Sequence, residues 1–280
     1  MQSNKVFIIG KRSNLSKSLN NSIDNSYLIS SNEIKEVEKE INDFKNINFI
    51  YNTSPKSDLL KYNQISPASY SNYSLFYLSN FIDLCKKYPY KINSILYTSS
   101  CSLYGENDNA KEDDDVKITS LHSALKISSE LFIKKFLEDI GINIVYARLF
   151  NMYGGNDNFS VISKIIHSIK NDYPFYLSNN GKAIRDFIHI NDVVEIYKLM
   201  LKLDHKGITN IATGLGTSTK QIINIAEKSY NKKLEIININ CPEVKTCVGS
   251  DELISKKLNY KKFIKLDDFI NRSINEWNYY

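Results

Sequence analysis

Two short stretches of the chain carry the residue types of a proton-transfer site. His122 and Lys126 lie four residues apart at the expected start of a helix, so their side chains would share one face. A predicted buried strand ends shortly before them in hydroxyl-bearing residues that include Ser100. Imidazole titrates near neutrality, and a neighbouring ammonium would lower its pKa. The spacing therefore indicates chemistry in which a proton passes to or from a bound molecule.

Alternating strands and helices would position both stretches. Short apolar runs such as Val6–Gly10 suit central strands that are buried on both faces. Alternation of this kind predicts an α/β fold with a Rossmann-type, doubly wound parallel sheet. The predicted strands are Val6–Gly10, Tyr27–Ser30, Asn48–Tyr51, Ser94–Thr98 and Ile144–Arg148, and the predicted helices are Ser13–Ser22, Glu33–Phe44, Ser71–Lys87 and His122–Asp139.

The segment Gly10–Lys17 joins the first strand to the first helix, which is the context of a dinucleotide-binding loop. Backbone N–H groups at a helix N-terminus bind a pyrophosphate there. The glycine pattern keeps Gly10, but Ser13 and Ser16 stand at the second and third positions. Serine is small enough to let a phosphate approach, so we expect cofactor contacts in this loop; a plain strand-to-helix turn without a ligand is the alternative. The expected contacts are Gly10, Lys11, Arg12, Ser13, Asn14 and Leu15.

Two features of the sequence favour NADP(H) over NAD(H). NAD sites usually place an acidic residue at the end of the second strand, and this chain has Ser30–Asn32 there, with Glu33 next. Lys11 and Arg12 lie in the loop where a 2′-phosphate could be bound by charge and by a guanidinium fork. Glu33 is close enough to leave NAD(H) as the alternative.

The second half of the chain has a different arrangement of predicted elements. It begins with a polar loop at 156–158 and continues with helices Val161–Lys170, Thr219–Tyr230 and Leu266–Trp277 and strands Phe187–Ile190 and Leu234–Ile239. We interpret residues 1–155 as a dinucleotide-binding domain to which later segments return. Residues 156–280 would form mainly a smaller α/β substrate domain at the carboxyl ends of the strands.

Composition narrows the class of protein further. The 280 residues are 42% hydrophobic and carry a net charge of +5 without a lysine- or arginine-rich block, which does not favour nucleic acid as a partner. The four cysteines show no metal-ligand or disulfide spacing. No signal peptide or membrane-spanning run is visible, so we expect a cytoplasmic protein without a metal or a membrane partner.

Three motifs together resemble the extended short-chain dehydrogenase/reductase family, in its NAD(P)-dependent epimerase/dehydratase branch, which modifies nucleotide-linked sugars. They are Ser99–Gly105, Arg148–Gly154 and Gly181–Val193, and the resemblance covers nearly the whole chain. Within the branch, the Gly10–Arg12 loop and the segment Asn156–Phe159 are most similar to GDP-fucose synthases, which use NADPH to epimerise and reduce a 4-keto sugar.

The resemblance implies the catalytic residues. In the family a tyrosine, a lysine four residues later and a serine or threonine handle the proton at the sugar C4 oxygen. The hydroxyl position is Ser100, the lysine is Lys126, and His122 stands where the tyrosine is expected; Glu130 fits an acidic residue on the same helix. By the same resemblance Asn52, Lys126 and Leu149 would contact the cofactor.

His122 admits three interpretations. It could be the acid itself. Alternatively Ser100, or another hydroxyl such as Ser123 or Tyr104, could relay the proton while His122 fills space. The third interpretation is a protein that binds cofactor and sugar and catalyses little.

The resemblance also implies the substrate contacts and limits the reaction. Asn151 would lie beside the sugar and Arg185 at the diphosphate, with Lys164 or Lys182 assisting; an ion pair of Arg185 with Asp186 or Asp192 is the structural alternative. The positions that move protons at sugar carbons in GDP-fucose synthases are Ser102 and Ser160 here, which are poor bases and disfavour epimerisation at C3 or C5. The expected substrate contacts are Ser100, Cys101, Ser102, Asn151, Ser160, Lys164 and Arg185, although strand alternation also fits Cys101 as a core residue.

Three functions remain open at this point. The leading prediction is NADPH-dependent reduction of the 4-keto group of a nucleotide-activated hexose or heptose for surface polysaccharide synthesis. A 4-epimerase or 4,6-dehydratase is the second, although dehydratases need an acid and a base where this chain has Cys101 and Ser102. A binding protein with impaired catalysis is the third. The expected partners are a nucleotide-diphosphate sugar and a second copy of the chain, paired through the helices at 71–87 and 122–139.

Overall fold

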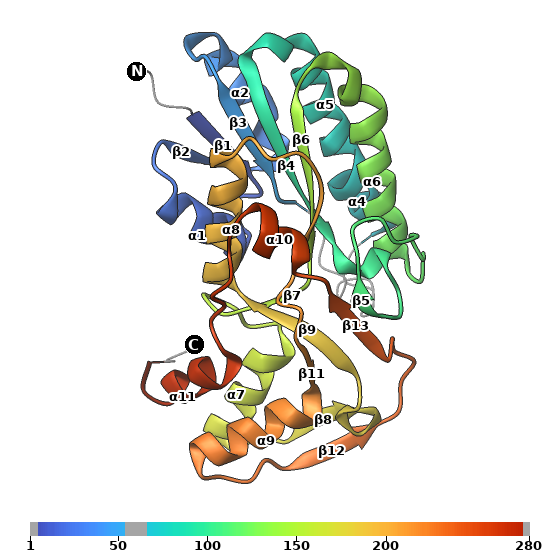
Figure 1. Ribbon diagram of the computed structural model, residues 1–280, viewed down its shortest axis with the longest axis vertical. Helices are drawn as coiled ribbons and strands as arrows, with labels where there is room; N and C mark the ends of the chain where they lie inside the picture. The colour runs from blue at the N-terminus through green and yellow to red at the C-terminus, as the bar shows by residue number, and fades with distance from the viewer. Residues whose placement is uncertain (1–4, 54–65, 277–280) are drawn as a thin grey trace. The chain divides into compact units, whose positions relative to one another are not determined.

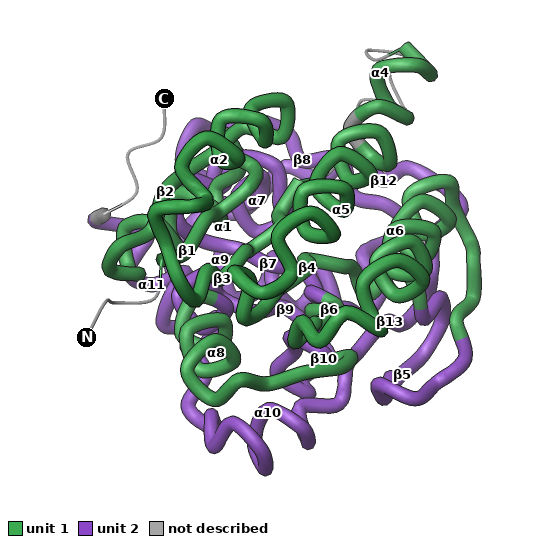
Figure 2. Tube along the Cα trace, turned by 90° about the horizontal axis from the view of Figure 1, so that it is seen from above, with its two compact units in different colours: residues 1–103, 116–148, 194–209 green, residues 104–115, 149–193, 210–280 purple. Residues whose placement is uncertain are grey.

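The computed structural model describes residues 5–53 and 66–276, and its contacts group into two compact units. Unit 1 comprises Met1–Leu103, Val116–Arg148 and Val194–Thr209, and unit 2 comprises Tyr104–Asp115, Leu149–Val193 and Asn210–Tyr280. Figure 2 colours the two units and shows how they alternate along the chain. The domain border expected between residues 155 and 156 stays a prediction.

Unit 1 is built on a six-stranded sheet (Figure 1). Its strands, in spatial order, are β10 (Gly207–Ile211), β6 (Asn143–Leu149), β4 (Ile92–Ser100), β3 (Ile47–Tyr51), β1 (Lys5–Ile9) and β2 (Ser26–Ile29). β1 runs parallel to β2 and β3, and β3 runs parallel to β4. The predicted Rossmann-type parallel sheet is confirmed. The order in which the chain adds strands reverses between β1 and β3, which is where open α/β sheets bind ligands.

Helices cover both faces of this sheet. They are α1 (Asn14–Ser22), α2 (Ile34–Glu40), α4 (Pro67–Ser71), α5 (Tyr77–Lys87), α6 (Leu121–Leu137) and α8 (Ile190–Lys202). α2, α5 and α6 share one apolar core with the sheet, in which Val37, Phe81 and Ile133 pack with Phe49 and Tyr97. α8 reaches the opposite face, where Tyr197 Oη lies 3.1 Å from Thr98 Oγ1. Burial on both faces explains why the strands are apolar runs without alternation.

The helix predicted at Ser71–Lys87 is interrupted by a wider turn. α4 begins at Pro67, because Ser66 Oγ accepts the backbone N–H of Ser69 and caps the helix. A π-helical turn at Asn72–Phe76 then joins α4 to α5. Such turns are rare and short, and the sequence pattern did not indicate this one.

Unit 2 contains two further sheets. The larger has the order β11 (Gly216–Ser218), β9 (Ile184–His189), β13 (Thr246–Gly249) and β5 (Asn107–Ala110), and β7 (Asn151–Tyr153) also pairs with β9. The smaller pairs β12 (Ile236–Ile239) with β8 (Phe175–Ser178). Helices α7 (Val161–Asn171), α9 (Thr219–Tyr230) and α11 (Leu266–Glu276) pack with these strands around a core that includes Ile166, Phe175, Ile222 and Ile270. The short helix α10 (Glu252–Lys257) follows β13.

Several boundaries in unit 2 differ from those expected. The strand predicted at Phe187–Ile190 begins earlier, at Ile184, and ends at His189, and α8 starts at the next residue, Ile190. The predicted strand Leu234–Ile239 begins at Ile236. Trp277, the predicted end of the last helix, lies outside the described residues. Several elements were not predicted, because most are short or lack a clear hydrophobic periodicity. They are strands β5, β7, β8, β10, β11 and β13 and helices α8 and α10.

Candidate active site

Gly10 begins the candidate cofactor loop and is required there by its surroundings. Its φ of +119° lies in the region that favours glycine, and a Cβ atom on it would be 2.0 Å from the carbonyl oxygen of Asn52. The backbone N–H of Gly10 donates to Ile29 O at 2.8 Å, and that of Asn52 donates to Ile9 O at 2.9 Å. The loop is thus fixed at the ends of β1, β2 and β3, where the sheet order reverses.

The two serines that replace glycines hold the loop in shape. The Asn52 amide donates from Nδ2 to Ser13 Oγ at 2.9 Å and to Ser16 Oγ at 2.8 Å. Ser13 also caps α1, since its Oγ accepts the N–H of Ser16. The loop therefore leads into the N-terminus of α1 with the glycine cradle and the N–H groups that a dinucleotide pyrophosphate requires. These features fit a pyridine dinucleotide, and the contacts expected from Gly10–Leu15 and Asn52 stay a prediction.

The end of β2 bears on the choice of cofactor. The Glu33 carboxylate accepts the backbone N–H of Ser30 at 3.2 Å in a capping box, so it is used by the chain itself. Lys11 and Arg12 are exposed, and the N–H of Lys11 donates to Ile29 O at 3.2 Å beside this strand end. Two cations therefore lie near the end of β2, whereas the carboxylate of Glu33 is hydrogen-bonded within the chain.

Lys126, one of the predicted catalytic residues, is a buried cation. It lies on α6, which packs against β4 and the turn Cys101–Leu103, and only 7% of it is exposed. Its Nζ donates to Thr98 O at 2.8 Å and lies 5.1 Å from the centre of the Tyr97 ring. Burial lowers the pKa of Lys126 to about 8, against the opposing effect of Glu130. The ammonium can therefore give up a proton near physiological pH.

A buried ion pair supports this side of α6. Arg148 Nη2 donates to Glu130 Oε2 at 2.9 Å and Nε donates to Oε1 at 3.3 Å, and Ser99 Oγ donates to the same carboxylate. Glu130 and Arg148 are 6% and 3% exposed, so a buried carboxylate with three hydrogen bonds lies on the same helix as Lys126. The role of Arg148 was missed from the sequence, where it was only part of a motif.

His122 is half-buried in the first turn of α6. Burial first, and then the charge of Lys126, lowers the pKa of His122 to about 4. At neutral pH the ring is therefore uncharged. His122 can donate or accept a hydrogen bond in this state, but it is a weak source of protons by itself.

Most of the alternative hydroxyls are committed elsewhere. Ser123 forms the capping box of α6 with Ser120, and its Oγ donates to Ser120 O at 2.8 Å. Tyr104 Oη donates to Asn210 Oδ1 at 2.7 Å. Ser100 Oγ accepts the N–H of Ser102 at 3.2 Å and can still donate its own proton. Among the candidate relay groups, Ser100 is therefore the hydroxyl that stays available.

Cys101 and Ser102 follow β4 in a 3-10 turn rather than continuing the strand. Cys101 is half-buried, so the strand alternation used to assign it to the core does not apply. Ser102 Oγ is buried and has no hydrogen-bond partner among the described residues. A buried hydroxyl without a partner is costly, which is consistent with the predicted contact to a ligand.

Unit 2 holds the remaining predicted substrate contacts. Asn151, in β7, donates from Nδ2 to Asp186 O at 3.2 Å. Ser160 caps α7, and its Oγ accepts the N–H of Ser163 at 3.1 Å. Lys164 on α7 and Lys182 are exposed, and Leu149 is half-buried at the end of β6. Ser160 thus has a structural role in addition to any contact with substrate.

Arg185 has partners other than those considered from the sequence. Its guanidinium donates to the carbonyls of Ile184, Val244 and Lys245, and Glu243 lies 4.0 Å away. Asp186 instead accepts the N–H and hydroxyl of Thr213 and the N–H groups of Gly214 and Gly249. The ion pair of Arg185 with Asp186 or Asp192, considered as an alternative, is not what the structure contains.

The motif around Arg185 mainly makes hydrogen bonds and packing contacts within unit 2. Asp192 accepts Tyr260 Oη at 2.6 Å and the N–H of Ile264 at 3.0 Å. The His189 ring packs edge-on against Tyr153, and a Cβ on Gly154 would be 2.4 Å from its Nε2. Burial, with a smaller effect of Arg272, lowers the pKa of His189 to about 4, so it is a neutral packing residue at neutral pH. The motif holds unit 2 together around Arg185.

A match to a family profile shows which proteins this chain is related to. The profile described as the NAD dependent epimerase/dehydratase family matches residues 2–212. The chain belongs to this family. The predicted resemblance to the epimerase/dehydratase branch is thereby confirmed, whereas the likeness to GDP-fucose synthases remains a prediction.

Curated members of the epimerase/dehydratase family include several similar enzymes. The UDP-glucose 4-epimerase of Mycoplasma genitalium is 27% identical over 161 residues, which cover 49% of this chain and 47% of that protein. The dTDP-4-dehydro-6-deoxyglucose reductase of Escherichia coli is 26% identical over 190 residues, covering 64% of this chain and 60% of that protein. The matched segments span about half to three-fifths of these relatives.

Solved structures show the same fold at low identity. MoeE5 in complex with UDP-glucuronic acid and NAD superposes with a TM-score of 0.82 at 18% identity, covering 95% of this chain and 96% of that one. The UDP-glucose 4-epimerase of Thermus thermophilus in complex with NAD gives a TM-score of 0.82 at 17% identity, with the same coverage. These likenesses establish the fold of this family member.

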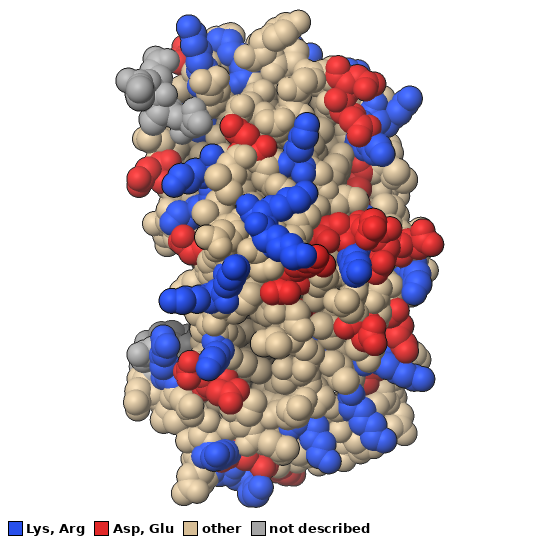
Figure 3. Space-filling view, viewed as in Figure 1, with Lys and Arg blue, Asp and Glu red and all other residues tan. Residues whose placement is uncertain are grey.

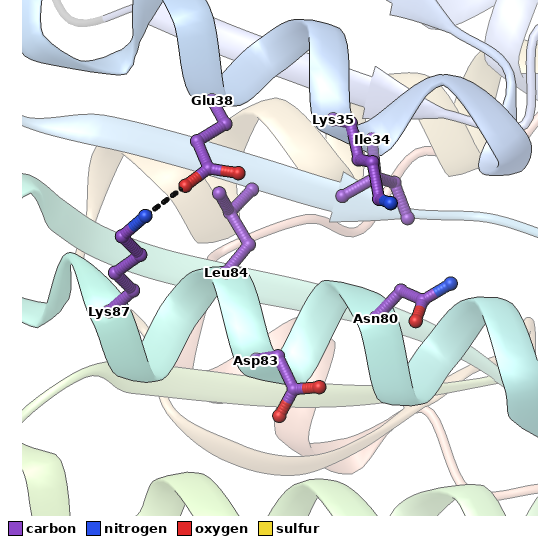
Figure 4. A pocket seen from close by; sticks show the side chains of 7 residues that line it. All are labelled: Ile34, Lys35, Glu38, Asn80, Asp83, Leu84 and Lys87. Carbon is purple, nitrogen blue, oxygen red and sulfur yellow. Dashed lines mark hydrogen bonds and ion pairs between the residues drawn. The ribbon is translucent and has the colours of Figure 1, made fainter.

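A separate groove lies on unit 1, between α2 and α5 (Figure 4). It has a volume of about 270 Å³ and is lined by Ile34, Lys35, Glu38, Asn80, Asp83, Leu84 and Lys87. Lys87 Nζ pairs with Glu38 Oε1 at 2.5 Å across it. The groove contains none of the residues predicted for the site, and its mixed charges do not single out a ligand.

The surface and the described side chains limit other functions. On the face in Figure 3, basic and acidic side chains are interspersed. Within 5–53 and 66–276, no three histidine, cysteine or acidic side chains group in a way that could hold a metal ion. None of the described helices combines the length and the apolar character needed to cross a membrane.

Proposed function

We propose that this epimerase/dehydratase family member is an NADPH-dependent reductase of the 4-keto group of a nucleotide-activated hexose or heptose. The observation that carries the proposal is Lys126, a buried ammonium with a pKa near 8 on the helix that packs against the end of β4, where Ser100 lies. Burying a cation is costly, so its retention at this place supports a role in the reaction. Surface polysaccharide synthesis in the cytoplasm would use such a product.

NADPH is the cofactor that the loop favours. Gly10–Leu15 and Asn52 would hold the pyrophosphate end, and Lys126 and Leu149 would contact the nicotinamide end. Lys11 and Arg12 supply positive charge near the end of β2, while Glu33 is engaged by Ser30. The complexes of MoeE5 and the Thermus epimerase contain NAD, which supports a pyridine nucleotide without distinguishing the two forms. When bound, NADPH supplies the hydride to C4.

The chain's own residues would supply the proton. Reduction turns the C4 carbonyl oxygen into a hydroxyl, so one proton must reach this oxygen. In our account the Lys126 ammonium is the source, and neutral His122 passes the proton by donating from one ring nitrogen while accepting at the other. Ser100 orients the carbonyl oxygen by a hydrogen bond. This relay needs the neutral ring that the lowered pKa of His122 provides.

Three side chains would supply the main contacts with the substrate. Arg185 offers a guanidinium for the diphosphate, Asn151 offers a polar contact for the sugar, and Ser102 offers a hydroxyl. The complexes of MoeE5 with UDP-glucuronic acid and with UDP-glucose support a nucleotide sugar as the ligand class. Lys164, Ser160 and Cys101 complete the proposed substrate contacts.

A 4-epimerase or a 4,6-dehydratase is the second candidate. Its support is the set of relatives, which includes UDP-glucose 4-epimerases and a dTDP-D-glucose 4,6-dehydratase. Against a dehydratase, Cys101 and Ser102 provide no acid and base pair. A binding protein with little catalysis is the third candidate, supported by the low pKa of His122.

The apolar surface of α6 leads us to propose a homodimer. The exposed side chains of Leu131, Phe132 and Phe136 lie on this helix, and Lys86 of α5 lies 5.4 Å from the Phe136 ring. A second copy would bury this apolar face. Light scattering should give twice the mass of one chain, and Phe132→Glu should reduce the measured mass to that of one chain.

A screen of 4-keto GDP-, UDP- and dTDP-sugars with NADPH, read by mass spectrometry, tests the proposed reduction. Wild-type protein should convert at least one sugar, Lys126→Ala should lower the rate by about a hundredfold or more, and His122→Phe should lower it by about tenfold or more. Full activity in His122→Phe would exclude the relay. No conversion of any sugar, with NADPH still bound, would favour the binding protein.

A further inference from the structure

Arg185 is held by the chain in a way that leaves part of its guanidinium available. Nη1 donates to Ile184 O at 2.8 Å and Lys245 O at 3.4 Å, and Nη2 donates to Val244 O at 2.6 Å. Arginine has five N–H donors, so Nε–H and one N–H of Nη2 have no hydrogen-bond partner among the described residues. Together these two donors form a fork that suits one phosphate group.

Glu243 lies next to this fork. Its Oε2 is 4.0 Å from Arg185 Nη2, which is too long for a hydrogen bond but close enough for strong attraction. Both side chains are partly buried, with 21% of Arg185 and 24% of Glu243 exposed, so water screens the pair less than it would at the surface.

Asn179 fixes the carboxylate in place. Its Nδ2 donates to Glu243 Oε1 at 2.6 Å and to Cys241 O at 2.6 Å, and its Oδ1 accepts the N–H of Cys241 at 3.2 Å. Asn179 has a φ of +46°, a conformation that asparagine tolerates better than most residues. The segment from Cys241 to Lys245 is thus tied at both ends, by Asn179 and by Arg185, with Glu243 between them.

We propose that Glu243 is an internal competitor that weakens the binding of a nucleoside diphosphate group at Arg185. The carboxylate compensates the guanidinium charge when no ligand is bound, and it repels an incoming diphosphate at the same fork. Binding is therefore weaker than the arginine alone would give, and release of the nucleotide sugar is faster. This inference rests on the proposed role of Arg185 in holding the diphosphate.

Titration calorimetry of the full chain with UDP and with GDP tests this inference. Glu243→Gln removes the charge and keeps an oxygen for the Asn179 amide, so it should bind at least one of them roughly three- to tenfold more tightly. Glu243→Asp keeps the charge and should stay within about twofold of wild type. Glu235→Gln, which removes an exposed carboxylate of the same unit, should also stay within about twofold and controls for net charge.

Arg185→Gln separates the inference from the proposed function. It should weaken binding by about tenfold or more, and adding Glu243→Gln to it should change nothing further, because the competitor would have no target. Unchanged or weaker binding in Glu243→Gln, or an equal gain in Glu243→Asp, would overturn the role of Glu243. Unchanged binding in Arg185→Gln would instead overturn the role of Arg185 in the proposed function.

Discussion

At the scale of single residues, the proposed proton relay gives Lys126 and His122 an order that follows from their pKa values. Lys126 loses its proton as the pH rises through about 8, and His122 gains one only as the pH falls through about 4. A histidine with an ordinary pKa would act as the acid directly. In the proposed relay, the lysine is therefore the source of the proton and the neutral histidine passes it on.

This order predicts the pH dependence of the reduction. We expect kcat/KM to be nearly constant from about pH 5 to 7 and to fall above about pH 8, as the Lys126 ammonium deprotonates. The measurement is the rate of NADPH oxidation with a converted 4-keto sugar across this range. A rate that instead rises steadily as the pH falls through about 6.5, the ordinary pKa of histidine, would make His122 the direct acid.

The buried ammonium should also reduce stability. The pKa of Lys126 is about 8 in the folded chain against 10.5 in the unfolded chain, so stability from this group is present above pH 10.5 and lost as the pH falls from 10.5 through 8. At pH 7 the net cost is about 3 kcal/mol. Replacing Lys126 would also remove the bond to Thr98 O, which would offset roughly 1 kcal/mol of the gain.

Lys126→Met should therefore be inactive but more stable at pH 7, by about 1–2 kcal/mol in urea unfolding. The gain should shrink toward pH 10.5. Lys134→Met, a change of an exposed lysine on the same helix, serves as the control and should be within about 0.5 kcal/mol of wild type. Destabilisation by Lys126→Met at pH 7 would show that the ammonium is better solvated than its burial indicates.

At the scale of elements, the loop after β1 depends on a contact that the sequence conceals. Asn52 lies 39 residues from Ser13 and 36 from Ser16, and only the parallel pairing of β1 with β3 brings them together. The two serines that weaken the glycine pattern are therefore the acceptors that fix the loop. The strand, the turn and the helix start could be predicted from local patterns, but the residue that joins them could not.

Asn52→Ala tests this arrangement. It removes both hydrogen bonds, so we expect NADPH to bind about tenfold more weakly and the unfolding free energy to fall by about 1–3 kcal/mol. Fluorescence titration and urea unfolding measure the two effects. Asn42→Ala, at an exposed asparagine of the same unit, should change neither. Unchanged NADPH affinity in Asn52→Ala would mean that the loop is not the cofactor site.

At the scale of the whole molecule, the sequence predicted the fold better than the site. Apolar runs buried on both faces identified β1, β3, β4 and β6, and the alternation with helices identified the sheet type. The order of the strands was not predictable, because it depends on which edges meet. In the candidate site, motifs in the sequence pointed to Lys126 and Ser100. The hydrogen bonds from Arg185 to the carbonyls of Val244 and Lys245 could not be predicted, because they depend on pairing with a strand far along the chain.

The central claim, reduction of a 4-keto nucleotide sugar, is tested most directly by labelled hydride. The protein is incubated with NADPH that carries deuterium at the transferred position and with the 4-keto sugars of the screen. We predict a product that contains one deuterium, bound to C4, in an amount equal to the NADPH consumed. An altered sugar that contains no deuterium, formed without consumption of NADPH, would contradict it and favour an epimerase or a dehydratase.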